Sequence, residues 1–189
     1  MNRDKENLKY LKLLKQNYSS SQAVIREIIN LSAITNLPKG TEFFLSDIHG
    51  EYEAFLHIMN NCSGVIKEKV DIIFGERLSE FDRQELCTLI YYPREKMTML
   101  AEIDRIDNDW YSMTLNYLIM LAKLLSSKYT RSKVRKALPE DYAYIIDELL
   151  HAQKNEDTNK VSYHRHILQT IIDLDDADEF IIALSTLIK

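Results

Sequence analysis

The stretch TEFFLSDIHGEYEA, residues 41–54, decides how the front of this chain folds. Its first five residues are mostly apolar and favour β structure, which predicts a strand over residues 41–45. Over residues 52–61, apolar side chains recur at the spacing of one helical face, which predicts a helix. A short loop containing Asp47 and His49 lies between the two segments. The stretch therefore predicts the order strand, loop, helix.

Asp47 and His49 are candidate metal ligands. Residues i and i+2 of an extended loop project to the same side, so the carboxylate and an imidazole nitrogen can reach one cation. Gly50 then opens the next helix, whose N-terminal N–H groups are unpaired and suit a phosphate. A bare Asp-x-His pair also occurs often by chance, and its structural interpretation is a capped turn with a surface histidine.

The wider sequence gives this pair a context. SDIHGE, residues 46–51, after an apolar strand resembles the first motif of the calcineurin-like metallophosphoesterases. The flanking residues 28–42 and 52–55 look like the beginning of a class III fructose-1,6-bisphosphatase. This resemblance implies that Asp47 bridges two metal ions and that His49 binds one of them.

The resemblance also implies an activity. The intact enzyme would be a metal-dependent phosphatase that hydrolyses fructose 1,6-bisphosphate to fructose 6-phosphate and phosphate in gluconeogenesis. Its cofactor would be Mn²⁺ or another divalent cation, bound as a pair, because two cations can activate a water and offset charge on the attacking and leaving oxygens. We further expect a homo-oligomer. The sequence does not indicate the substrate-binding residues.

The resemblance runs along the whole chain but covers only the front of the family's enzyme. The family's later ligand motifs, Gly-Asp-x-x-Asp-Arg, Gly-Asn-His and Gly-His-x-His, do not occur in the sequence. We therefore expect an N-terminal portion in which residues 1–62 hold the first helices and the strand-loop-helix unit. Residues 63–189 would form a helical insertion, and the rest of the catalytic domain is absent. Two ligands cannot complete two coordination shells, so this portion alone is expected to be inactive.

Composition predicts a mainly α fold, and the resemblance implies that it is the helix-rich N-terminal part of an α/β metallophosphatase with one or two strands. Only 4 glycines and 3 prolines in 189 residues argue for long helices and few tight turns. Beyond residues 52–61, helices are expected near residues 7–15, 20–37, 79–91, 94–106, 109–127, 131–136, 139–151, 160–172 and 177–188. Pro139 fits the first position of its helix. The helix around residues 110–125 is apolar on most sides, which suits either the core or a contact with another chain.

Several segments imitate functional sites. Residues 70–76 could form a second strand ending in an acidic ligand, with Asp82-Arg83 as a later pair, but the spacing favours a helical insertion. His164 and His166 would lie about 200° apart on a helix and could not share a metal. Residues 173–179 lack the Gly and Glu of a calcium loop, so their acidic side chains are expected to favour a helix N-terminus.

Charge and cysteine usage limit the partners. The net charge of −5 gives no general attraction to nucleic acid or to anionic membranes, and no apolar run is long enough to span a bilayer. We therefore expect no nucleic-acid or membrane partner and a cytoplasmic location. Cys62 and Cys87 lack metal or disulfide spacing and are expected to be small buried thiols. The basic patch at residues 128–136 suits a solvated face, a phosphorylated ligand or an acidic subunit.

A second class of function competes with the enzyme. A non-enzymatic helical module could bind a partner through its apolar helix faces, with Asp47 and His49 as an ordinary loop. The scarcity of glycine and the incomplete ligand set support it. It explains less of residues 43–55.

Overall fold

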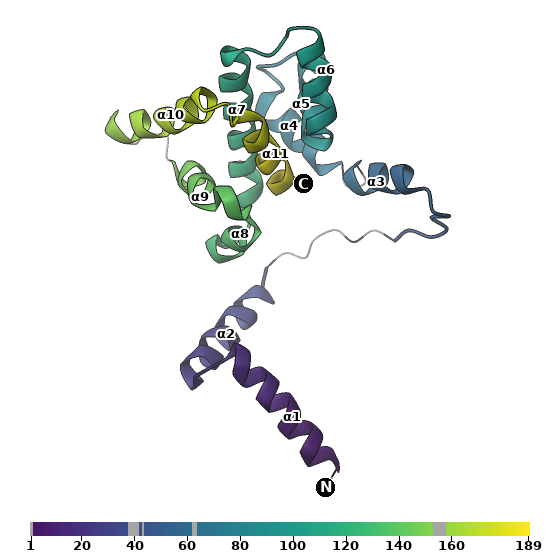
Figure 1. The fold of residues 1–189 in the computed structure, drawn as a ribbon, viewed down its shortest axis with the longest axis vertical. Coiled ribbons are helices and arrows are strands. Elements are labelled where there is room, and N and C mark those ends of the chain that lie inside the picture. The colour runs from purple at the N-terminus through teal and green to yellow at the C-terminus, as the bar shows by residue number, and fades with distance from the viewer. Residues whose placement is uncertain (1, 38–41, 43, 62–63, 153–157) are drawn as a thin grey trace. The chain divides into compact units, whose positions relative to one another are not determined.

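The computed structural model describes the chain except residues 1, 38–41, 43, 62–63 and 153–157, and at residues 2–6 and 158–160 it describes the backbone alone. The described residues form eleven α-helices and one 3-10 helix (Figure 1). In chain order the elements are α1 (Asn2–Asn17), α2 (Ser21–Ile34), α3 (Tyr52–Asn61), α4 (Val65–Phe74), α5 (Glu80–Tyr91), α6 (Pro93–Glu102), α7 (Asn108–Ser126), α8 (Arg131–Ala137), η1 (Glu140–Tyr142), α9 (Ala143–His151), α10 (Thr158–Asp173) and α11 (Ala177–Ile188). The mainly α fold class is confirmed.

The strand expected over residues 41–45 is not formed at its described positions, Glu42, Phe44 and Leu45. Thr41 and Phe43 lie outside the described residues. Backbone groups of a strand need a neighbouring strand as hydrogen-bond partner, and none occurs in the part of the chain that the structure describes. The side chain of Phe44 is 91% exposed, so it does not pack against the core. Residues 65–74, which include most of the candidate second strand, form α4.

The helices begin where side chains satisfy their first N–H groups. Ser20 caps α2 through its hydroxyl oxygen, which accepts a hydrogen bond from the Ala23 N–H at 3.2 Å. Asp107 caps α7 in the same way, accepting from the Trp110 N–H at 2.7 Å. Pro93 is the first residue of α6, where its missing N–H costs nothing. These local signals explain why sequence alone places most of the helices.

Several helix boundaries differ from the expected ones: α1 is longer than residues 7–15, and α2 ends at Ile34 instead of residue 37. Two further differences lie at α6 and α9. The helix expected over residues 94–106 ends at Glu102, because the chain reverses at Asp104, whose φ is +53°. Pro139 does not occupy the first position of an α-helix. It precedes the short 3-10 helix η1, and α9 begins only at Ala143.

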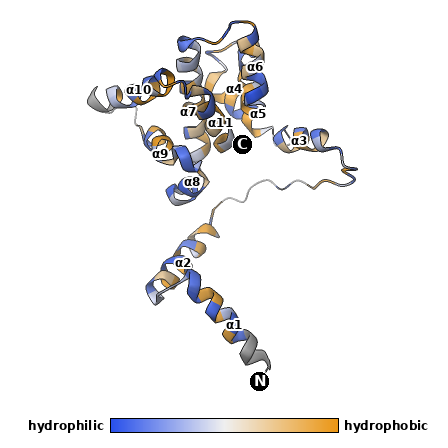
Figure 2. Ribbon diagram, in the orientation of Figure 1, coloured by the Kyte–Doolittle hydropathy of each residue, from blue (hydrophilic) through white to orange (hydrophobic). Residues whose placement is uncertain are grey.

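The chain divides into two compact units, Met1–Glu42 and Phe43–Lys189. In the first unit, α1 and α2 carry apolar stripes (Figure 2), but the large apolar side chains on them are mostly exposed. The exposed members are Leu8, Tyr10, Leu11, Leu13, Val24, Ile25, Ile28, Ile29, Leu31 and Ile34. This unit therefore buries little apolar surface of its own.

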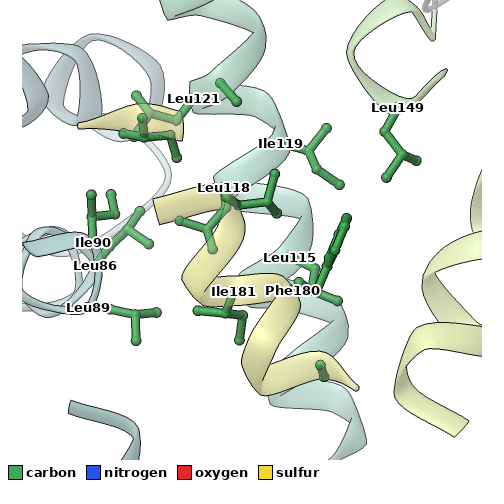
Figure 3. Packing of buried hydrophobic residues seen from close by; sticks show 14 of the residues in the cluster. Leu86, Leu89, Ile90, Leu115, Leu118, Ile119, Leu121, Leu149, Phe180 and Ile181 are labelled. Carbon is green, nitrogen blue, oxygen red and sulfur yellow. The ribbon is translucent and has the colours of Figure 1, made fainter. Parts of the chain in front are cut away.

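The second unit contains the hydrophobic core. Helix α7 packs against α4, α9, α10 and α11, and α11 packs in turn against α5 and α6. Figure 3 shows the meeting of these helices, with Leu115 and Leu118 of α7 beside Phe180 and Ile181 of α11. Leu118, Phe180 and Ile181 are fully buried. The sequence left two roles open for the apolar helix around residues 110–125, a core helix or a contact with another chain. As α7, it is the central helix of the core.

The boundary expected between residues 62 and 63 falls outside the described residues and stays a prediction. Helix α3 and its preceding loop belong to the same compact unit as the core. Within the described residues, no helix is both long enough and apolar enough to cross a membrane.

Candidate functional site

Asp47 and His49 lie in the loop that leads into α3, and both have left-handed backbones. Their φ angles are +56° and +53°, and Gly50 follows with a φ of +78°. The Glu51 N–H donates to the Ile48 carbonyl at 3.0 Å, which closes a turn around His49. Asp and His tolerate the left-handed region better than most residues. The loop is therefore a tightly turned entry to the helix, not the extended segment that the sequence suggested.

Both candidate ligands nevertheless face the same hollow. It has a volume of about 260 Å³ and is open to solvent. Its lining residues are Leu45, Ser46, Asp47, Ile48, His49, Glu51, Ala54, Phe55 and Ile58. Ligand pockets usually measure about 300–1,000 Å³, so this hollow is smaller than a typical ligand pocket.

The donors in this hollow fit part of a metal site. A carboxylate and an imidazole are ligands that divalent transition metals accept. Among the described residues, however, no three His, Cys, Asp or Glu side chains gather closely enough to hold an ion. Asp47 and His49 could thus supply two ligands of a coordination shell whose other members come from elsewhere.

Sequence reasoning missed Glu51, a further acidic residue of the hollow. It lines the same surface as Asp47 and His49. Its carbonyl accepts the first helical hydrogen bond of α3, from the Phe55 N–H at 3.0 Å. The sequence shows that Asp47, His49 and Glu51 alternate with other residues. The backbone turns tightly at Gly50, so this spacing alone does not predict that Glu51 lines the same hollow.

The segments that imitate sites are structural. Asp82 belongs to the start of α5, where its N–H donates to the Ser79 hydroxyl at 3.1 Å. Arg83 forms an ion pair with Asp71 at 2.6 Å. His164 and His166 lie on the single helix α10, which confirms that they cannot share a metal.

The acidic run near residues 173–179 also has structural partners. Asp178 and Glu179 lie in the first turn of α11, where negative charge is favourable. The hydroxyl of Tyr111 donates to Asp178 at 2.8 Å, and Arg94 pairs with Glu179 through two contacts of 3.1 and 3.2 Å. The helix-terminus interpretation is confirmed.

The basic patch has an acidic neighbour within the chain. Arg131 and Arg135 approach the same carboxylate oxygen of Asp147, at 3.0 and 3.8 Å. The ammonium of Lys133 lies 4.4 Å from the centre of the Tyr129 ring. Much of the patch is therefore engaged internally, which favours a structural role over ligand attraction.

Cys87 is half-buried, and burial raises the pKa of its thiol. A raised pKa leaves less thiolate at neutral pH, so Cys87 is a poor nucleophile. This supports the expected small buried thiol. Cys62 lies outside the described residues.

Comparison with known proteins places this arrangement in a class. The class 3 fructose-1,6-bisphosphatase of Clostridium botulinum (strain Loch Maree / Type A3) is 55% identical over 185 residues, which is 98% of this chain and 28% of that protein. The enzyme of the same name from Clostridium acetobutylicum (strain ATCC 824) is 54% identical over 185 residues, with the same coverage of both chains. The chain thus spans about 28% of the length of these curated relatives. No solved structure matches the chain.

A family model gives the assignment. Residues 9–189 match the family described as Firmicute fructose-1,6-bisphosphatase. Because the match covers nearly the whole chain, the chain belongs to this family.

Proposed function

We propose that this chain is the N-terminal portion of a metal-dependent phosphatase that hydrolyses fructose 1,6-bisphosphate to fructose 6-phosphate and phosphate. Two relatives that are 55% and 54% identical carry the name fructose-1,6-bisphosphatase class 3, and the family match spans residues 9–189. The observation that carries the proposal is the shared hollow of Asp47 and His49 at the entry to α3.

In this proposal Asp47 and His49 hold divalent metal, with Mn²⁺ as the expected ion. When bound, a pair of divalent ions supplies positive charge that activates a water and offsets the charge of the phosphate. The carboxylate of Asp47 would contribute negative charge and oxygen ligation, and His49 a neutral nitrogen ligand. The N-terminal N–H groups of α3 would favour a phosphate nearby.

The set of metal ligands that this chain supplies is therefore incomplete. Two side chains cannot close the coordination shells of two ions, so the 189-residue chain alone is expected to bind metal weakly and to release little or no phosphate. A homo-oligomeric assembly and a cytoplasmic location stay predictions.

The test is a chimera in which this chain replaces the matched 185 residues of the Clostridium botulinum relative. We expect Mn²⁺-dependent phosphate release from fructose 1,6-bisphosphate. Asp47→Ala in the chimera should lower kcat by more than about 100-fold, since losing even an outer-shell partner costs about 10–100-fold.

Asp104→Ala is the matched control. Asp104 is also an exposed aspartate with a left-handed backbone, but it lies between α6 and α7, outside the hollow. It should leave kcat within about twofold, because most surface substitutions are nearly neutral. A folded chimera without activity would argue against the enzyme and favour the helical interaction module. An equal loss of kcat in Asp47→Ala and Asp104→Ala would refute the role of Asp47 as a metal ligand.

A further inference from the structure

Three side chains tie the C-terminal end of α3 to the junction between α5 and α6. Nδ1 of His57 lies 2.5 Å from the hydroxyl oxygen of Tyr92, and Nδ2 of Asn61 lies 3.2 Å from the same oxygen. The His57 and Tyr92 rings also stack, with centroids 6.1 Å apart and planes inclined by 11°. We call His57, Asn61 and Tyr92 the α3 clamp.

The direction of these hydrogen bonds follows from donor chemistry. Nδ2 of Asn61 lies 2.9 Å from the backbone carbonyl of His57, which can only accept, so this atom is the amide nitrogen. Its second hydrogen is then available to the Tyr92 oxygen. Nδ2 of Asn61 also lies 3.3 Å from Nδ1 of His57, and an amide nitrogen can only donate. An Nδ1 that accepts suits this contact and a Tyr92 hydroxyl that donates to it. We therefore assign the hydrogen of neutral His57 to Nε2.

One side of the clamp is fixed by the core. Tyr92 lies between Tyr91 and Pro93, which are both buried. Its N–H donates to the Thr88 carbonyl at 2.8 Å, and its carbonyl accepts from the Lys96 N–H at 3.0 Å. The phenol ring is thus anchored at both backbone groups to helices of the helical body.

The other side of the clamp is α3, a helix with no fully buried residue. At about 1.5 Å per residue its ten residues span about 15 Å, so the clamp at one end controls the position of the other. That other end continues into the loop of Asp47 and His49, and α3 itself lines the hollow through Ala54, Phe55 and Ile58.

We propose that Tyr92 is a positioning residue, which acts through His57 and Asn61 to fix α3 on the helical body and so sets where the Asp47 and His49 loop is held. The consequence for metal binding rests on the proposed function. The clamp itself does not rest on the proposed function, because it consists of contacts between described residues of this chain.

The first test is the tautomer of His57 in the 189-residue chain. Long-range ¹H–¹⁵N spectra of histidine-labelled protein, recorded where His57 is neutral, should show its hydrogen on Nε2. Tyr92→Phe removes one hydroxyl and keeps the stacked ring, so the Nδ1 resonance should move toward that of an imidazole nitrogen without a donor. Tyr144→Phe, which removes the same group from an exposed tyrosine on α9, should leave His57 unchanged. A hydrogen on Nδ1 in the wild-type chain would overturn the assigned donors and acceptors of the clamp.

The second test is amide hydrogen exchange along α3. Loss of the two hydrogen bonds of the Tyr92 hydroxyl, worth together about 1–2 kcal/mol, should speed exchange in α3 by about fivefold to thirtyfold in Tyr92→Phe, with exchange in α7 unchanged. With Tyr92 intact, His57→Gln should keep exchange in α3 slow, because its amide oxygen can accept from the Tyr92 hydroxyl, whereas His57→Leu should speed it. Unchanged exchange in Tyr92→Phe, or equal exchange in the two His57 variants, would refute positioning.

These outcomes separate the clamp from the proposed function. Neither measurement uses metal or substrate. A clamp that passes both tests in a protein whose chimera is inactive would refute the enzyme and leave the positioning of α3 intact. An active chimera, together with unchanged amide exchange in α3 of Tyr92→Phe, would support the enzyme and refute the positioning of α3 by the clamp.

Discussion

Asp47 and His49 share a backbone property that metal ligation does not require. Both are non-glycine residues with φ near +55°. Such a conformation costs roughly 1–2 kcal/mol for an L-residue and is often found at functional sites. Because an unconstrained loop would relax, the turn closed by the Glu51 N–H must hold these two residues in place. The strain agrees with the proposed metal site, in which Asp47 and His49 would be fixed before the metal binds.

Ser185 has a buried hydroxyl that lowers stability and has no function that the structure shows. The Ser185 side chain is fully buried in α11, and its hydroxyl has no hydrogen-bond partner among the described residues. Burying an unpaired hydroxyl costs about 1–3 kcal/mol. Ser185→Ala should therefore raise the free energy of unfolding by about 1–2 kcal/mol, measured by urea denaturation.

The control for Ser185→Ala is Ser162→Ala on α10. Ser162 is exposed, so its substitution reports helix propensity alone, at most about 0.5 kcal/mol. If both variants change stability equally, the Ser185 hydroxyl is satisfied in solution.

At the scale of elements, two helices end with aspartate where glycine is usual. At the end of α6, the Arg105 N–H donates to the Leu100 carbonyl and the Asp104 N–H donates to the Ala101 carbonyl, both at 3.0 Å. This pair of bonds is the Schellman motif, whose left-handed position favours glycine. Asp175 occupies the same position after α10, with a φ of +61°.

Asp104→Gly should consequently stabilise the protein. The substitution relieves a left-handed L-residue, and part of that gain is offset by the greater entropy of glycine in the unfolded chain. The expected increase is about 0.5–1 kcal/mol in the free energy of unfolding. Asp109→Gly, in the first turn of α7, should lower it by about 0.5–1 kcal/mol. A destabilised Asp104→Gly would show that the Asp104 carboxylate contributes more than its backbone costs.

The contact between η1 and the start of α11 gives the protein a pH dependence. Burial, together with a hydrogen bond donated to Asp176 at 2.9 Å, raises the pKa of Tyr142 to about 12. The unfolded chain ionises this phenol near pH 10, so between about pH 10 and 12 the folded state binds more protons than the unfolded state. Stability from this group is present below pH 10 and is lost as pH rises through 12.

Tyr142→Phe should flatten that dependence. Unfolding measured at pH 9, 10 and 11 should show a shallower loss of stability in Tyr142→Phe than in the wild-type chain. Tyr10→Phe, at an exposed tyrosine of α1, serves as the control and should keep the wild-type slope. Identical slopes in all three proteins would place the Tyr142 hydroxyl in solvent.

At the scale of the molecule, burial is unevenly distributed. Every buried apolar residue that the structure describes lies between Ile66 and Ile188. Helices of 14 to 16 residues are marginal in water without tertiary packing, and α1 and α2 bury little. We expect fast amide exchange in α2 and slow exchange in α7, where Leu118 is fully buried.

Deletion of residues 1–42 should therefore change Tm by less than about 3 °C, the shift that corresponds to roughly 1 kcal/mol for a domain of this size. Thermal unfolding followed by circular dichroism measures it, with Leu118→Ala in the intact chain as the comparison. That cavity should cost about 2–5 kcal/mol and lower Tm by roughly 5 °C or more. A similar fall in the deletion variant would show that the first unit contributes to the stability of the second.

The amino-acid sequence by itself determined most of the helices, because caps and apolar periodicity act within about four residues. The helices over residues 52–61 and 177–188 follow from such signals, and so does the closeness of Asp47 and His49. Only the tertiary structure decided which apolar faces are covered: α7 is central while α2 is exposed, although both carry apolar stripes. It also brought Tyr92 to His57 across 35 positions of sequence. The physical reason is that burial and side-chain pairing depend on partners far along the chain, which no local pattern encodes.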